Sequence, residues 1–159
     1  MSDITLTIDG RTVHAAPGTT ILEAARSIGI KIPTLCWHED LGAPSACRVC
    51  VVEIVGARIL QPACSYPVSQ GITVRTNSPV VREARRMAVE LLLAHHPDDC
   101  LSCARNLRCE LQQLASDLGI REIRFERIER GLPKDESSPS IVRDPDTCIN
   151  CRRCVEACE

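Results

Sequence analysis

The chain has very few aromatic residues, no long apolar run and no excess of one charge. Its only large rings are Trp37, Tyr66 and Phe125, so aromatic packing cannot be the main source of core burial. No apolar segment approaches the roughly 20 residues of a membrane span, and no signal peptide follows Met1. The net charge of −2, with acidic and basic residues intermixed, gives no basic stripe for nucleic acid. We therefore expect a cytoplasmic protein that binds no nucleic acid and has no direct membrane span.

Cysteine, in contrast, is abundant: eleven residues fall into three groups, with none left over. An odd number cannot form a closed set of disulfides, which indicates metal ligands instead. The groups are Cys36, Cys47, Cys50 and Cys64; Cys100, Cys103 and Cys109; and Cys148, Cys151, Cys154 and Cys158. His96 stands four residues before Cys100 and is the obvious fourth ligand of the second group. Metal binding would supply cohesion that the small core lacks, so the metal-free chain should fold poorly.

Two of the three groups are compatible either with zinc or with an iron–sulfur cluster. Two residues separate Cys47 from Cys50, so one tight loop can present both thiolates to the same metal centre. The first group fits a 2Fe-2S cluster or a four-thiolate zinc site, and the preceding hairpin and helix pattern favours the cluster. The second group combines one imidazole with three thiolates, which is also a common structural zinc set. His95 competes with His96 for that imidazole position.

The third group has the most specific spacing. Its pattern, Cys-x2-Cys-x2-Cys-x3-Cys, is the ferredoxin run for a 4Fe-4S cluster, and zinc sites rarely use it. One departure is that Glu159 stands where a proline usually follows the fourth cysteine. In two-cluster ferredoxins the fourth cysteine of a run ligates the other cluster. We therefore expect Cys158 to serve a neighbouring cluster.

The regular elements predicted around these groups are short and give an α+β fold. Alternating residues on either side of Asp9 and Gly10 predict a β-hairpin over 4–8 and 11–15. Thr20 and Glu23 form a capping box that begins a helix, and Gly29 ends it. Further expected elements are strands at 49–54, 58–60 and 71–75, helices at 79–95 and 109–118, a strand or extended arm at 121–130, and a linker at 131–140.

Six stretches of the sequence share a pattern with a known family. They are residues 33–36, 47–53, 62–64, 95–100, 109–112 and 138–144. With the three cysteine groups, they resemble the N-terminal iron–sulfur region shared by the large subunit of respiratory complex I, the catalytic subunits of multimeric FeFe hydrogenases and NAD-linked formate dehydrogenases. The likeness covers essentially the whole chain. Leu107 is a departure, because a glycine is common at that position of the family and tolerates a positive φ that leucine resists.

The resemblance implies three iron–sulfur domains. Residues 1–78 would form a β-grasp 2Fe-2S ferredoxin-like domain with its cluster on Cys36, Cys47, Cys50 and Cys64. Residues 79–131 would form a small helical domain with a 4Fe-4S cluster on His96, Cys100, Cys103 and Cys109. Residues 132–159 would form a linker and the first half of a truncated 4Fe-4S ferredoxin-like domain. There Cys148, Cys151 and Cys154 would hold a second 4Fe-4S cluster, and Cys158 would ligate the neighbouring one.

The function implied by the resemblance is electron transfer within a hetero-oligomer. The chain would relay electrons between a flavin-bearing, NAD(P)H-oxidising partner subunit and a terminal redox site, beside further iron–sulfur subunits. The sequence has no Gly-x-Gly-x-x-Gly loop, so we expect nicotinamide and flavin to bind another subunit. The family's catalytic region is missing, so we expect no catalytic site in this chain. Two alternatives remain: the N-terminal fragment of a catalytic FeFe hydrogenase subunit, and a zinc-stapled interaction module.

Several arginines lie between the expected ligands and are candidates for tuning the clusters. They are Arg48, Arg105, Arg108, Arg152 and Arg153. Charge and hydrogen bonds near a cluster are established influences on its reduction potential. The alternative for each is an ordinary solvated position in a loop.

Overall fold

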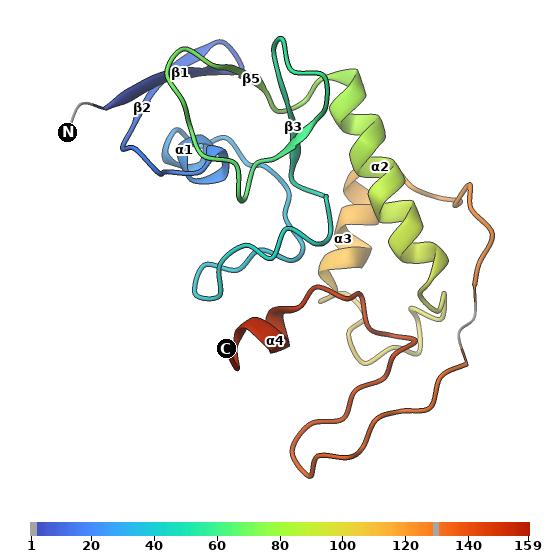
Figure 1. Ribbon diagram of the computed structural model, residues 1–159. Coiled ribbons are helices and arrows are strands. Elements are labelled where there is room, and N and C mark those ends of the chain that lie inside the picture. Colours follow the sequence, from blue (N-terminus) through green and yellow to red (C-terminus); the bar gives the residue numbers. More distant parts are fainter. Residues whose placement is uncertain (1–2, 129–130) are drawn as a thin grey trace. The chain divides into compact units, whose positions relative to one another are not determined.

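The computed structural model describes residues 3–128 and 131–159, and it divides into two compact units. The first unit contains the chain up to Arg85 together with Arg152–Glu159. The second unit is Arg86–Cys151. Both helices and strands are present, which confirms the predicted α+β class (Figure 1). None of the described helices is long and apolar enough to cross a membrane.

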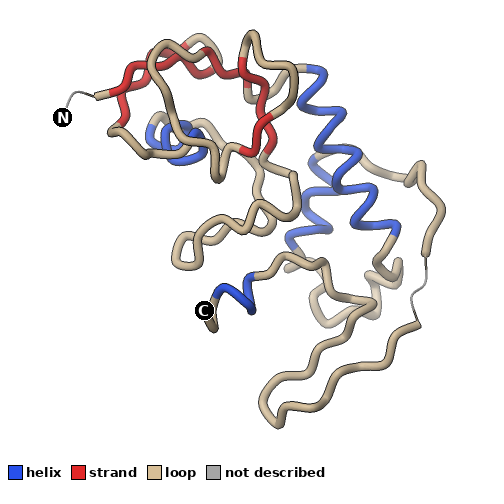
Figure 2. Tube along the Cα trace, viewed as in Figure 1, coloured by secondary structure: helices blue, strands red, loops and turns tan. Residues whose placement is uncertain are grey.

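A five-stranded mixed sheet forms the frame of the first unit, with the strand order β2-β1-β5-β3-β4. The strands are β1 (Ile4–Ile8), β2 (Arg11–Ala15), β3 (Val51–Ile54), β4 (Gln61–Pro62) and β5 (Thr73–Arg75). The predicted hairpin is confirmed: β1 and β2 are antiparallel, and Asp9 and Gly10 both have positive φ in the turn between them. β5 pairs in parallel with β1 and antiparallel with β3. Figure 2 shows the strands of this sheet in red.

Helix α1 (Ile21–Ser27) begins at the predicted capping box. The Thr20 hydroxyl accepts from the Glu23 N–H at 3.3 Å, and the Glu23 carboxylate accepts from the Thr20 N–H at 2.7 Å. The buried face of α1 belongs to one hydrophobic cluster with the sheet. Members of that cluster include Leu6, Ile8, Ile21, Leu22, Val52 and Val74. Because Cys50 and Cys64 belong to the same cluster, the core fixes the backbone on which these thiols stand.

Three further helices complete the described elements: α2 (Pro79–Ala94), α3 (Glu110–Asp117) and α4 (Arg153–Glu156). α2 begins as predicted, with proline in its first position and Val81 N–H donating to the Ser78 hydroxyl at 3.4 Å. α3 buries Leu111 and Leu114. All cysteines except Cys154, which lies in α4, are outside helices and strands.

One predicted strand is wrong, and another is absent where the sequence left an alternative open. Residues 58–60 form no strand, and β4 pairs with β3 just after them, at Gln61–Pro62. Of the two structures predicted for 121–130, a strand or an extended arm, the strand is absent over 121–128, and residues 129–130 lie outside the described part of the chain. The alternating pattern of this segment has another cause: Arg124 and Arg127 bind groups on and just after α2, and Ile128 N–H donates to the Ala94 carbonyl at 2.9 Å. The predicted boundaries of the three domains stay predictions.

Candidate metal centres

The four cysteines of the first group are arranged as two close pairs. The sulfur atoms of Cys50 and Cys64 lie 3.3 Å apart, and the thiols of Cys36 and Cys47 are hydrogen-bonded to each other. Cys36, Cys50 and Cys64 are buried, and Cys47 is partly buried. Cys36 lies in a bend at 35–36, Cys47 and Cys50 lie in the loop that leads into β3, and Cys64 lies in the turn that follows β4. The structure therefore brings together all four thiols that the sequence singled out, from segments up to 28 residues apart in the chain.

In each pair, a hydrogen bond between the two cysteines shifts their pKa values in opposite directions. The pKa of Cys36 is lowered to about 5, chiefly because the Cys47 thiol donates a hydrogen bond to it. The pKa of Cys64 is lowered to about 6, chiefly because Cys50 donates to it in the same way. The pKa values of Cys47 and Cys50 are raised, because each holds the shared proton and is buried. Within each pair, the hydrogen bond thus favours the thiolate form of one cysteine, and the thiolate is the form that binds metals.

The loop that contains Cys47 and leads to Cys50 adds two polar features. Ser45 Oγ lies 3.6 Å from Cys64 Sγ and donates to Ser65 Oγ at 2.7 Å. Ser45 and Arg48 have φ of 54° and 57°. Left-handed residues in such loops turn backbone N–H groups inward, and concavities of this kind are common at iron–sulfur sites. The loop thus offers donors to sulfur from its backbone and from one hydroxyl.

The pairwise arrangement suits a 2Fe-2S cluster. In such a cluster two irons are each held by two cysteine thiolates, so two pairs of sulfur atoms are required. In the described part of the chain, no three or more His, Cys, Asp or Glu side chains gather in a way that could hold a single metal ion. The two pairs of the first group supply two sulfur atoms for each iron of such a cluster.

The second group lies in the loop between α2 and α3. His96 follows α2, and its Nδ1 is 2.8 Å from the Pro97 carbonyl oxygen. Cys100 and Cys103 share a turn, and Cys109 caps the N-terminus of α3. His95 is held differently, because its Nδ1 lies 3.0 Å from the Leu91 carbonyl of its own helix. The structure keeps the four predicted ligands in one loop but does not gather them around a common point.

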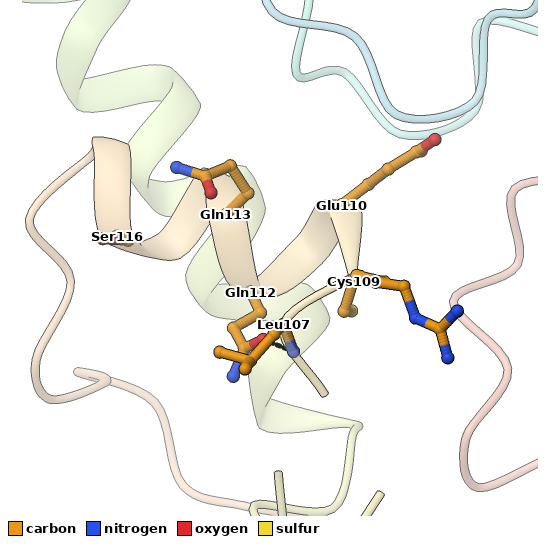
Figure 3. Close-up of a pocket in the computed structure, with 7 residues that line it drawn as sticks. Leu107, Cys109, Glu110, Gln112, Gln113 and Ser116 are labelled. Carbon is orange, nitrogen blue, oxygen red and sulfur yellow. Dashed lines mark hydrogen bonds between the residues drawn. The ribbon is translucent and has the colours of Figure 1, made fainter. Parts of the chain in front are cut away.

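The turn before Cys109 is closed by a side chain of α3. Leu107 has φ of 62°, and its N–H donates to Gln112 Oε1 at 2.9 Å. Gln112 Nε2 also donates to Asn106 Oδ1 at 3.0 Å. Figure 3 shows Gln112 reaching back from α3 beside Leu107. Leu107, which stands where a glycine is common in the family, therefore adopts a positive φ that glycine would tolerate more easily.

A pocket opens along the same stretch. It is lined by Leu107, Arg108, Cys109, Glu110, Gln112, Gln113 and Ser116. Figure 3 shows these side chains spread along the first turns of α3. Because Cys109 is one of the predicted ligands, the pocket belongs to the second cysteine group and is not a separate site.

A buried carboxylate on α2 binds two arginines within the second unit. Glu90 of α2 is completely buried, and it accepts hydrogen bonds from Arg86 Nε at 2.8 Å and from Arg124 Nε at 2.6 Å. Burial raises the pKa of Glu90, but the hydrogen bonds from Arg124 and Arg86 outweigh it, so the net pKa is lowered. Glu90 stays ionised and ties the segment after α3 to α2. In the sequence, this residue is visible only as an interruption of the apolar face.

Arg127 holds the backbone around His96. Its guanidinium donates to the His96 carbonyl at 3.0 Å and to the Leu93 carbonyl at 3.3 Å. It also lies 3.6 Å from a carboxylate oxygen of Asp98. Carbonyls at the end of a helix lack intrahelical partners, so this side chain satisfies groups that would otherwise need water. The position of the predicted imidazole ligand thus depends on a residue 31 positions later.

The third group surrounds α4. Asn150 and Arg152 have φ of 54° and 63°, so this loop also contains left-handed residues. Cys148 Sγ lies 3.7 Å from Asn150 Oδ1, and Cys154 and Cys158 are exposed. Cys148 and Cys151 belong to the second unit, and Cys154 and Cys158 belong to the first. The structure therefore does not place these two halves of the group relative to each other.

The arginines predicted to tune the clusters are mostly exposed. Arg48, Arg105, Arg108 and Arg152 have exposed side chains, and Arg153 is partly buried and donates to the Trp37 carbonyl at 3.2 Å. A different arginine was missed: Arg85 on α2 is 6% exposed and donates to the Val51 carbonyl at 2.8 Å. In the sequence, the only sign that Arg85 is buried was its position among apolar residues at helical spacing.

Comparison with known families places two iron–sulfur regions in the chain. Residues 2–79 match the family described as a 2Fe-2S iron-sulfur cluster binding domain. Residues 85–124 match the family described as the NADH-ubiquinone oxidoreductase-G iron-sulfur binding region. These matches contain the first and second cysteine groups, and the third lies outside both. The predicted 2Fe-2S and 4Fe-4S cofactors are confirmed, which favours iron–sulfur chemistry over zinc at these groups.

Relatives and a solved structure extend the likeness over nearly the whole chain. The chain is 49% identical to the NADP-reducing hydrogenase subunit HndD of Solidesulfovibrio fructosivorans, over 99% of this chain and 28% of that protein. It is 41% identical to the second G-type subunit of NADH-quinone oxidoreductase from Rhizobium meliloti (strain 1021), over 98% of this chain and 18% of that protein. A crystal structure of NAD+-reducing [NiFe]-hydrogenase in the H2-reduced state superposes with a TM-score of 0.89 at 36% identity. That match covers 97% of this chain and 65% of the solved chain.

The chain thus spans less than a third of these two curated relatives. Within that span, the family matches and the relatives agree with the likeness inferred from the six sequence stretches. Residues 2–79 and 85–124 thus match two iron–sulfur families, and nearly the whole chain is similar to an iron–sulfur region of a G-type subunit of NADH-quinone oxidoreductase and of the NADP-reducing hydrogenase subunit HndD.

Proposed function

We propose that this chain relays electrons through its iron–sulfur clusters, between a flavin-bearing, NAD(P)H-oxidising partner subunit and a terminal redox site. The observation that carries the proposal is the pairing of Cys36 with Cys47 and of Cys50 with Cys64, inside a region that matches a 2Fe-2S domain. An iron–sulfur cluster supplies a centre that gains and loses one electron. The proposed compartment is the cytoplasm.

The chain's own residues hold the clusters, keep water away and adjust their electrostatic surroundings. Cys36, Cys47, Cys50 and Cys64 are the proposed 2Fe-2S ligands, and burial of three of them limits solvent access. His96, Cys100, Cys103 and Cys109 are the proposed ligands of a 4Fe-4S cluster. Cys148, Cys151 and Cys154 are proposed for a second one, with Cys158 reaching a neighbouring cluster.

The partners follow from what relatives do and from what this sequence contains. Relatives are subunits of an NADP-reducing hydrogenase and of an NADH-quinone oxidoreductase, which supports a hetero-oligomer. The sequence contains no Gly-x-Gly-x-x-Gly loop, which supports a separate subunit for nicotinamide and flavin. The higher identity to the hydrogenase subunit, 49% against 41%, favours a hydrogenase-type complex as the setting.

The test is spectroscopy of anaerobically purified protein. We expect bound iron and sulfide, a brown sample, and separate 2Fe-2S and 4Fe-4S signals by low-temperature EPR after reduction with dithionite. A colourless, zinc-loaded sample without EPR signals would refute the proposal. Hydrogen uptake by this chain alone should be absent, and any uptake would show that the chain has a catalytic site of its own.

A pair of adjacent histidines tests the ligands of the second group. His96→Cys should keep a cluster but change its EPR signal and potential, because a thiolate replaces a neutral imidazole and makes the cluster more negative. The matched control is His95→Cys, which should leave the signal unchanged because this ring is turned to the Leu91 carbonyl. The reverse result would assign the ligand to His95.

A further inference from the structure

A buried arginine lies next to the first cysteine group. Arg85 on α2 is 6% exposed, and its Nη2 donates to the Val51 carbonyl oxygen at 2.8 Å. Val51 directly follows Cys50, a proposed ligand of the 2Fe-2S cluster. The hydrogen bond therefore fixes a positive charge to the peptide beside a cluster thiolate.

The surroundings of Arg85 do not neutralise that charge by direct contact. Within the described residues, no carboxylate forms an ion pair with Arg85, and its buried Nε has no hydrogen-bond partner. Burial of a charge without a partner is costly, so such a group points to a nearby negative charge. Desolvation lowers the pKa of Arg85 to about 10, while Cys50 and Asp9 act in the opposite direction. The guanidinium thus remains charged at neutral pH.

We infer that Arg85 is the internal counter-charge of the 2Fe-2S cluster and that it raises the reduction potential of that cluster. The inference rests on the proposed assignment of Cys36, Cys47, Cys50 and Cys64 as ligands. Reduction adds one electron to one ferric ion, breaks no bond and moves no proton, so the cluster gains one negative charge. A fixed positive charge in a setting of low dielectric constant stabilises the reduced form more than the oxidised form.

Two neighbouring arginines of α2 lack these properties. Arg82 is exposed, and it donates to the Asn77 carbonyl at 2.9 Å. Arg86 is bound to the carboxylate of Glu90. Solvent and salt screen an exposed charge, and an ion pair neutralises a buried one. Arg82 is therefore a matched control for Arg85: it has the same side chain, lies on the same helix and also donates to a backbone carbonyl.

The experiment is a redox titration of the full chain, with dithionite as the reductant and EPR as the readout. In Arg85→Met the ratio of reduced to oxidised 2Fe-2S cluster at a fixed ambient potential should fall about tenfold, equivalent to about 59 mV for a one-electron couple. Arg85→Lys keeps the charge and should retain most of the wild-type potential. Arg82→Met should leave the potential unchanged, and the 4Fe-4S signals of each sample provide an internal reference.

Each outcome decides the question. Loss of the 2Fe-2S signal in Arg85→Met but not in Arg85→Lys would support the inference, because the charge would then be required to hold the cluster. An unchanged potential in Arg85→Met, an equal shift of all clusters, or loss of the signal in both variants would overturn it. A wild-type protein without a 2Fe-2S signal would instead refute the proposed function, and that result is visible before any variant is compared.

Discussion

The side chain of Gln112 holds the backbone of Leu107 in a left-handed turn, through a hydrogen bond of 2.9 Å from the Leu107 N–H to Gln112 Oε1. Leu107 has φ of 62°, and its side chain is 88% exposed. A non-glycine residue with left-handed φ costs roughly 1–2 kcal/mol in conformational free energy. An exposed leucine side chain gains almost no free energy from burial to offset that cost. The loop before Cys109 is thus strained, and one amide side chain counteracts the strain.

Leu107→Gly should therefore stabilise the second unit. Glycine adopts positive φ without the steric cost, although it also increases the entropy of the unfolded chain, so we expect a net gain of about 0.5–1 kcal/mol. The control is Leu101→Gly, because Leu101 is 93% exposed in the same loop and is not among the positive-φ residues. That variant should lose stability. The measurement is anaerobic denaturant unfolding followed by visible absorption of the clusters, and destabilisation by Leu107→Gly would contradict the prediction.

The Gln112 side chain gives a second prediction. In Gln112→Ala the N–H of Leu107 and the side chain of Asn106 both lose their partner, so the loop should open and release iron faster to a chelator, by about threefold to tenfold if one hydrogen bond is worth about 1 kcal/mol. Gln113→Ala is the control, because Gln113 only donates to Asp117 along the same helix, at 2.7 Å. Equal rates of iron release from the two variants would show that Gln112 does not hold the loop.

Two local signals in the sequence predicted the structure correctly. The Asp9 and Gly10 turn and the Thr20 capping box depend on residues within four positions of one another, and the structure confirms both. Local patterns did not decide between a strand and an extended arm over 121–128, where Arg124 binds Glu90 of α2, 34 positions earlier. Local patterns also did not reveal the hydrogen bond of Arg85, because its acceptor lies 34 positions earlier in the chain.

In the candidate site, too, the sequence predicted some features and not others. Cysteine spacing singled out all four members of the first group, because the spacing of candidate ligands depends only on their positions in the sequence. Spacing did not indicate which thiols form pairs, and the packing of Cys50 and Cys64 into the core determined this. Nor did it identify Ser45, whose hydroxyl reaches Cys64 only because the chain folds back across 19 positions.

Ser45 and Ser65 should have opposite effects on the 2Fe-2S cluster. The single hydroxyl proton of Ser45 has three acceptors within reach: Cys64 Sγ at 3.6 Å, Ser65 Oγ at 2.7 Å and the Ala43 carbonyl oxygen at 3.4 Å. A hydrogen bond to a ligating sulfur stabilises the reduced cluster and raises its potential. Ser45→Ala removes the donor and should lower the potential, whereas Ser65→Ala removes one competing acceptor and should leave it unchanged or raise it. EPR-monitored titration of both variants is the test, and a lowered potential in Ser65→Ala would exclude the hydroxyl as the cause.

Glu90→Gln should strongly destabilise the second unit. The substitution leaves the side chains of Arg86 and Arg124 without their buried carboxylate, which should cost about 2–3 kcal/mol in the free energy of unfolding at pH 7. The matched control is Glu53→Gln, which breaks a looser ion pair with Arg75, at 3.6 Å, and should cost about 0.5 kcal/mol. Denaturant unfolding followed by circular dichroism measures both variants, and similar losses would contradict the special role of Glu90.

The stability that Glu90 contributes should also depend on pH. Its pKa is lowered in the folded protein, so the unfolded chain binds a proton more readily than the folded one. The contribution is therefore fully present above the ordinary carboxyl pKa of about 4.3, and it is lost as the pH falls through the lowered pKa of the folded state. The difference in unfolding midpoint between wild type and Glu90→Gln should be constant from pH 7 to pH 5 and should shrink below about pH 4. A difference that grows on acidification would mean that Glu90 is protonated in the folded protein, which is incompatible with its two arginine partners.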